Sequence, residues 1–184
     1  TWSTLRPLYL GDGPLHAEAV RQTIALPDWP GFSTDTLAAA GVDETERALI
    51  RDVLDSYQYT NALALVVLSA LLAHYEPRPA DAVMPAGAAP KPLGARIPEL
   101  PPMEALDPEV AALVSELNTF GEDTEPQLIA SMYRHLAYWP SYLALVRTML
   151  VPLQGQGQLD ALTQSTRALG HAQGVHRHAG SGGQ

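Results

Sequence analysis

The sequence predicts an all-α protein, and its composition and patterning lead to that class. Hydrophobic residues make up 46% of the 184-residue chain, which is enough to build a core. Alanine and leucine dominate this set, and both cost little free energy in a helix. β-Branched residues are sparse outside short runs, and several segments carry helix-capping patterns. We therefore expect an all-helical chain arranged as two pseudo-repeated halves that are joined by a long Pro-rich linker.

The first half, expected over 1–76, contains the clearest helix of the chain. That helix is predicted over 42–57, because Asp43 and Glu46 form a capping-box pattern and apolar residues recur on one face. Shorter helices are expected before it, over 14–23 and 35–40.

Asn61 opens the most apolar stretch of the sequence, SYQYTNALALVVLSALLA. We expect a separate helix over 61–74 with Asn61 as its N-cap, because asparagine is among the best capping residues. Its positions are apolar nearly all round, which predicts burial on most sides. The apolar run over 62–73 spans 12 residues. A membrane span needs about 20, so no membrane association is expected.

The prolines mark the linker and the start of the second half. The interval 77–108 holds 9 of the 16 prolines, which favours an extended linker over 77–107. Asp107 and Pro108 then form a proper helix start at the head of a second half expected over 108–170. Helices are expected there over 108–118, 127–138, 141–153 and 159–169. The Gly- and His-rich tail, 171–184, is expected to be disordered.

The two ends of the chain share a weak internal sequence similarity, which favours two related halves. LRPLYLGDGPLHAEA near the start resembles LVPLQGQGQLDALTQ near the end. The matched pairs, with one residue of slip, are Pro7 with Pro152, Leu8 with Leu153, Leu15 with Leu159, and Ala17 with Ala161.

The charge of the chain limits its partners. The formal net charge is -9 and the isoelectric point is about 5.0, so the surface repels phosphate backbones and nucleic-acid binding is not expected. The same charge repels a carboxylate at long range, so a carboxylate site must be locally positive or rich in donors. The chain has no cysteine and opens on no recognisable signal peptide, and we expect a cytoplasmic location.

Several polar residues have a structural and a functional interpretation. Asn61 is a helix cap or an amide that orients water or a carboxylate, and Tyr57 and Tyr59 are packing residues or pocket walls. Metal binding is not expected of His171, His176 and His178, because they lie on a Gly-rich tail. The acids Glu122, Asp123 and Glu125 suit the start of a helix, and a general base is the alternative.

Two segments of the chain resemble the group I 2-haloacid dehalogenases, the DehI-like family. In AAGVDETERALIRDVLDSYQYTNALALVVLSAL, the match includes Gly41, Asp43, Tyr59 and Asn61. In IASMYRHLAYWPSYLALV, the matching residues are Ala130, Ser131, Leu136, Ala137, Trp139, Pro140 and Leu143. The resemblance covers most of the chain to about residue 170. It implies an all-helical fold of two repeats and hydrolysis of small 2-haloalkanoic acids by activated water, with no metal or organic cofactor.

The resemblance also assigns site residues. It implies that Asn61 positions water or substrate, and that the substrate is held near Tyr57, Ala130, Ser131 and Met132. Met132 stands where the family has its catalytic aspartate, and a thioether cannot accept a proton at working pH. Family members are longer at both ends, so we expect uncovered apolar surface and a homodimer.

Three functions follow from this pattern. The chain is a dehalogenase-like hydrolase acting on carbon–halide bonds, an inactive relative that binds a small carboxylic acid or apolar ligand, or a helical interaction module. Loss of the base at Met132 favours the second over the first, because general-base catalysis is typically worth about 10²–10⁴-fold.

Overall fold

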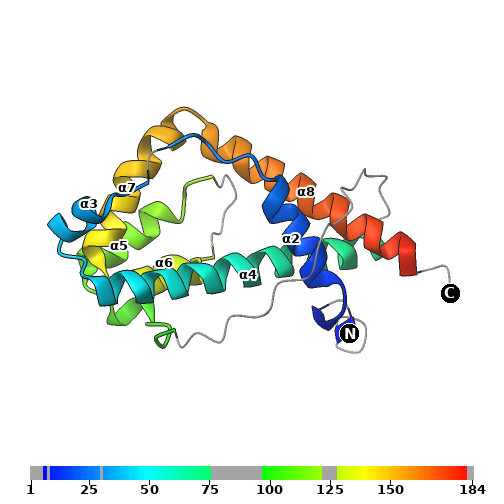
Figure 1. Cartoon of the computed structure of the whole chain (residues 1–184), viewed down its shortest axis with the longest axis horizontal. Coiled ribbons are helices and arrows are strands. Elements are labelled where there is room, and N and C mark those ends of the chain that lie inside the picture. Colours follow the sequence, from blue (N-terminus) through cyan, green and yellow to red (C-terminus); the bar gives the residue numbers. More distant parts are fainter. Residues whose placement is uncertain (1–5, 8, 30, 76–96, 122–127, 182–184) are drawn as a thin grey trace. The chain divides into compact units, whose positions relative to one another are not determined.

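The protein is all-helical in the computed structural model, which describes residues 6–7, 9–29, 31–75, 97–121 and 128–181 (Figure 1). No strand occurs in these ranges, and the predicted all-α class is confirmed. The elements are α2 (Gly13–Thr23), α3 (Thr34–Ala39), α4 (Glu44–Tyr75), the 3₁₀ helix η1 (Met103–Ala105), α5 (Pro108–Leu117), α6 (Ser131–Leu136), α7 (Pro140–Gly155) and α8 (Gln158–Ser181).

The chain divides into two compact units, each assembled from separate segments. Unit 1 comprises Thr1–Ala25, Gln58–Leu93 and Gln164–Gln184, and unit 2 comprises Leu26–Tyr57 and Gly94–Thr163. The helices α4 and α8 each contribute residues to both units. This division differs from the sequential halves expected over 1–76 and 108–170. Most of the expected linker, 77–96, lies outside the described residues.

Unit 2 is built around the mutual packing of α5, α6 and α7. Its core consists of Val42, Ile50, Val53, Val114, Leu117, Leu136, Ala137, Trp139 and Leu143. Trp139 is buried at the N-cap of α7, directly before Pro140, so this pair both separates two helices and fills the core. Burial of such side chains is the main term that stabilises this unit.

The helix starts in unit 2 follow the capping chemistry of the sequence. Asp43 and Glu46 form the predicted capping box: the Asp43 N–H donates to Glu46 Oε2 at 2.9 Å, and the Glu46 N–H donates to Asp43 Oδ1 at 2.8 Å. Asp107 Oδ1 accepts the Glu109 N–H at 2.9 Å, with Pro108 at the first helical position. Gly41, with a φ of 81°, supplies the left-handed turn between α3 and α4.

Unit 1 packs α2 against the parts of α4 and α8 that belong to it. Its core contains Ala17, Val20, Leu63, Val66 and Val67. Two glycines of α8 face α4 with no room for a side chain: an added Cβ at Gly170 would meet Leu65, and one at Gly174 would meet the Ala70 backbone. A buried hydrogen bond of 2.8 Å joins His16 Nδ1 and Gln173 Oε1.

Three expectations for these helices are wrong. The helix α4 runs without a break through Asn61, which is therefore not an N-cap but an exposed residue in the interior of a 32-residue helix. The helix α8 continues to Ser181, so the tail from 171 is helical through that residue, and Ala172 and Gln173 are buried. The predicted helix over 127–138 is shorter, because Ala130 has an extended backbone and α6 ends at Leu136.

The helix α4 is also more exposed than its composition predicts. Over Glu44–Ala73 it is long and apolar enough to cross a membrane, yet only 28% of its most apolar window is buried. Leu68 and Leu72 lie one turn apart and are 61% and 50% exposed. A core helix of a soluble protein passes the same test of length and composition, so this finding does not by itself indicate a membrane.

Candidate functional site

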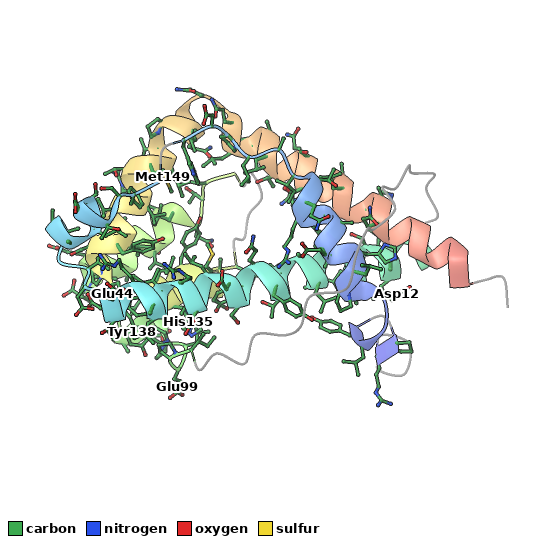
Figure 2. The ribbon with its side chains drawn as sticks, in the orientation of Figure 1. Asp12, Glu44, Glu99, His135, Tyr138 and Met149 are labelled. Atoms are coloured by element: carbon green, nitrogen blue, oxygen red, sulfur yellow. The ribbon has the colours of Figure 1, made fainter. Side chains whose placement is uncertain are left out.

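The described end of the Pro-rich segment is attached to α6 and the following turn by side-chain donors of unit 2. Arg134 donates from Nε and Nη2 to the Pro101 carbonyl at 3.0 and 2.7 Å. Tyr138 donates from its hydroxyl to the Glu99 carbonyl at 2.9 Å (Figure 2). Because proline has no N–H, this segment cannot form helical hydrogen bonds throughout, and its carbonyls remain available as acceptors.

Tyr57 and His135 form a partly buried hydrogen-bonded pair in unit 2. The Tyr57 hydroxyl lies 2.6 Å from His135 Nδ1, and His135 Nε2 lies 2.9 Å from the Pro98 carbonyl. A carbonyl oxygen can only accept, so in the neutral ring Nε2 carries the proton and Nδ1 accepts from the phenol. The buried imidazole therefore has a fixed tautomer, and Tyr57 has a fixed direction for its own proton.

Ser131 and Arg134 both affect the pKa of the Tyr57 phenol. Burial raises the pKa of Tyr57 above its ordinary value, while a hydrogen bond with Ser131 and the positive charge of Arg134 act to lower it. Ser131, Arg134 and His135 lie three and four residues apart on α6, which places them on one face of the helix. We call Tyr57, Ser131, Arg134 and His135 the Tyr57 cluster.

Asn118 fixes the start of α6, on which the Tyr57 cluster depends. Its buried amide donates from Nδ2 to the Leu128 carbonyl at 3.1 Å and accepts the Ala130 N–H at Oδ1 at 2.7 Å. This contact joins the end of α5 to the residues that precede Ser131. It satisfies an N–H at a helix start that lacks a side-chain cap.

The phenols of unit 2 predict a loss of stability at alkaline pH. Burial raises the pKa values of Tyr57, Tyr133 and Tyr142 above the ordinary value of 10.0. The unfolded chain therefore loses these protons first, so their stabilisation is complete below pH 10 and is lost as pH rises through the raised values. Thermal unfolding followed by circular dichroism should show a falling melting temperature above that pH. Tyr142→Phe should flatten the fall, and a curve that Tyr142→Phe leaves unchanged would contradict this cause.

The structure brings together only some of the residues predicted for the site. Tyr57 and Ser131 are hydrogen-bond partners in unit 2. Met132 is partly buried and packs against the core of that unit. Ala130 is exposed and contributes its backbone N–H to Asn118. Asn61 belongs to unit 1. The acids Glu122, Asp123 and Glu125 lie outside the described residues.

Sequence reasoning missed Arg134, His135 and Asn118. A signal for the first two was present, because Ser131, Arg134 and His135 recur at helical spacing within one of the segments that resemble the dehalogenases. No comparable signal marked Asn118, whose partners lie 10 and 12 residues further along the chain.

The Tyr57 cluster offers donors and a positive charge rather than metal ligands. Among the residues that the structure describes, no group of three or more His, Cys, Asp or Glu side chains could hold a metal ion. The Arg134 guanidinium is suited to an anion, because it can bind a carboxylate with two parallel hydrogen bonds, whereas the Tyr57 proton is already donated to His135. Comparisons with protein-family models, with curated protein sequences and with solved structures each find no match to this chain.

Proposed function

We propose that this chain is a dehalogenase-like protein that binds small carboxylic acids at the Tyr57 cluster. The observation that carries the proposal is the position of Arg134 three residues after Ser131 on α6, with its positive charge acting on the Tyr57 phenol and its guanidinium held by the Pro101 carbonyl. Arg134 uses two of its five N–H donors on the Pro101 carbonyl, which leaves donors for a carboxylate. The sequence resemblance independently assigns Tyr57 and Ser131 to the substrate.

The charge distribution supports an anion at this position. The chain carries a formal net charge of -9, so a carboxylate needs a local cation to bind. Within the described ranges, no Asp or Glu forms an ion pair with Arg134. Its charge is therefore not neutralised by those residues, and a ligand carboxylate would supply the missing counter-charge.

Turnover needs a base that the Tyr57 cluster does not supply readily. In hydrolytic dehalogenation, water attacks the carbon that bears the halogen, the halide leaves with the bonding electrons, and a base takes the proton of the water. Met132 cannot accept that proton, both ring nitrogens of His135 already make hydrogen bonds, and burial disfavours the ionised form of Tyr57. Binding with little or no turnover is therefore our first proposal. Hydrolysis of 2-haloalkanoic acids, with Asn61 positioning water, is the second and rests on the resemblance alone.

Calorimetry with 2-chloropropionate tests the binding proposal. Arg134→Gln should weaken binding roughly ten- to hundredfold, because a charge-assisted hydrogen bond contributes about 1.5–3 kcal/mol. Arg51→Gln is the matched control. Arg51 is an exposed arginine of α4 in the same unit, and its substitution removes the same charge. Melting temperatures of both variants separate lost binding from lost folding.

Two results would count against this function. If the folded native chain takes up no 2-chloropropionate, or if Arg134→Gln and Arg51→Gln weaken binding equally, the Tyr57 cluster is not a carboxylate site. The third sequence-based function, a helical interaction module without a small-molecule ligand, would then be favoured.

Other expectations from the sequence stay proposals. These are the internal repeat of two halves, the homodimer and the cytoplasmic location. The exposed Leu68 and Leu72 on α4 are compatible with a dimer contact. Sedimentation velocity tests the dimer directly, and a concentration-independent monomer would contradict it.

A further inference from the structure

We propose that a second site, a cavity in unit 2, binds a small organic ammonium ion with an apolar body. The cavity has a volume of about 620 Å³ and lies between the segment before η1, the start of α5 and the turn before α7. Its volume falls within the range of about 300–1,000 Å³ typical of small-molecule sites. None of the residues of the Tyr57 cluster lines it, so this inference does not depend on the carboxylate proposal.

The charged lining of the cavity is acidic. Glu99 and Asp107 both line it, and both side chains are exposed. Within the part of the chain that the structure describes, neither carboxylate takes part in an ion pair. Asp107 caps α5 through the Glu109 N–H at 2.9 Å, which holds its carboxylate in place without neutralising it. A cation is the ligand that these two carboxylates would attract.

An aromatic ring of fixed position lines the same cavity. The Tyr138 hydroxyl donates to the Glu99 carbonyl at 2.9 Å, and the ring makes an edge contact with Trp139 at a centroid distance of 6.1 Å. The side chain is still 48% exposed, so a ligand can reach it. Ammonium groups are attracted to aromatic faces, and a ring that is already held in place loses little entropy on binding. Tyr138 and Glu99 are labelled in Figure 2.

The rest of the lining favours an apolar body behind the charge. Pro101, Pro102 and Pro140 contribute rigid rings, and Val110 contributes a branched side chain from α5. Arg134 donates to the Pro101 carbonyl from outside the lining, so its positive charge lies behind one wall and opposes a cation, which the two carboxylates must outweigh. A fully hydrophilic cation such as a metal ion would leave these apolar surfaces unused. The geometry therefore fits an alkyl- or arylammonium ion.

Titration calorimetry with benzyltrimethylammonium chloride tests this site on the full chain. We expect saturable binding to one site, at least about fivefold tighter than that of neutral benzyl alcohol. The affinity should fall as the salt concentration rises, because exposed ion pairs are screened. Equal affinity for benzyl alcohol, or no saturable binding of the cation, would overturn the proposal.

Charge variants locate the ligand. Glu99→Gln should weaken binding about two- to fivefold, the effect of losing an exposed ion pair. Asp107→Asn should do the same, because asparagine keeps the helix cap while removing the charge. Glu104→Gln is the matched control: Glu104 is exposed and nearby in sequence but does not line the cavity. If it weakens binding as much as Glu99→Gln, the attraction is only the general acidic field, and the site is refuted.

A steric variant gives a second test that does not change charge. Ala105 lines the cavity and is exposed, so Ala105→Leu should fill part of the space with little effect on folding. We expect it to weaken benzyltrimethylammonium binding at least tenfold while the melting temperature stays close to that of the native chain. Unchanged affinity in a folded Ala105→Leu variant would place the ligand elsewhere and overturn the proposal.

Discussion

Gly174→Ala is expected to be more destabilising than Gly170→Ala or Gly155→Ala, and to act on unit 1. An added Cβ would lie 2.5 Å from the Ala70 nitrogen and 2.6 Å from the Ser69 carbonyl carbon. Both atoms belong to the backbone of α4, so the contact can be relieved only by moving a helix. Overpacking typically costs about 1–3 kcal/mol and occasionally more, and we expect the upper end. The melting temperature should fall by roughly 6–12 °C for a cost of about 3 kcal/mol.

Two other glycines provide graded controls for this prediction. At Gly170 an added Cβ would meet the side chain of Leu65, which can change rotamer, so Gly170→Ala should cost less. At Gly155, near the end of α7, nothing lies within 4 Å, and alanine is the better helix former by up to about 1 kcal/mol. Gly155→Ala should therefore be neutral or stabilising. If all three variants melt at the same temperature, the close approach of α8 to α4 is not what stabilises unit 1.

These glycines also explain why the sequence misleads at the end of α8. Glycine lowers helix propensity, and a segment with Gly170, Gly174 and several histidines is therefore predicted to be disordered. In the folded chain the same residues allow α8 to approach α4 closely, and the buried bond between His16 and Gln173 adds a polar contact. Tertiary packing outweighs the local preference, and composition alone cannot reveal a partner that is distant in sequence.

Where local chemistry decides, the sequence predicts correctly. The capping box at Asp43 and the start of α5 at Asp107 involve groups within three residues of each other. The expected break before Asn61 is wrong for a related reason. No glycine or proline lies between 57 and 61, and the cost of one asparagine inside a helix, about 0.7 kcal/mol or less, is too small to end it.

The candidate site is only partly predictable for a different reason. Ser131, Arg134 and His135 share one helix face and can be grouped from their spacing. Tyr57 meets His135 across a sequence separation of 78 residues, a contact that no local pattern encodes. The resemblance to the dehalogenases brought Tyr57 and Ser131 into one hypothesis, whereas the partners Arg134 and His135 emerged only from the folded chain.

Met132→Asp is expected to create dehalogenase activity if the chain retains the scaffold that its sequence resembles. The new carboxylate would take a proton from water as the oxygen attacks C2 of 2-chloropropionate and chloride leaves. General-base catalysis is worth about 10²–10⁴-fold, so chloride release should exceed that of the native chain by a factor in this range. Because Met132 is partly buried against the core of unit 2, a stability cost of about 1–3 kcal/mol is expected as well.

Met132→Asn is the control that isolates the base. Asparagine is polar and nearly the same size as aspartate, but it cannot accept the proton. The Met132→Asn variant should therefore bind 2-chloropropionate without releasing chloride. Chloride should be measured with each enantiomer of the substrate, beside calorimetric binding and thermal melting of every variant. Equal activity of the Asp and Asn variants would show that position 132 is not the base. A folded Asp variant that binds 2-chloropropionate but releases no chloride would contradict this prediction. It would show that loss of the base alone does not explain an inactive site. The surrounding pocket would then also differ from that of a dehalogenase.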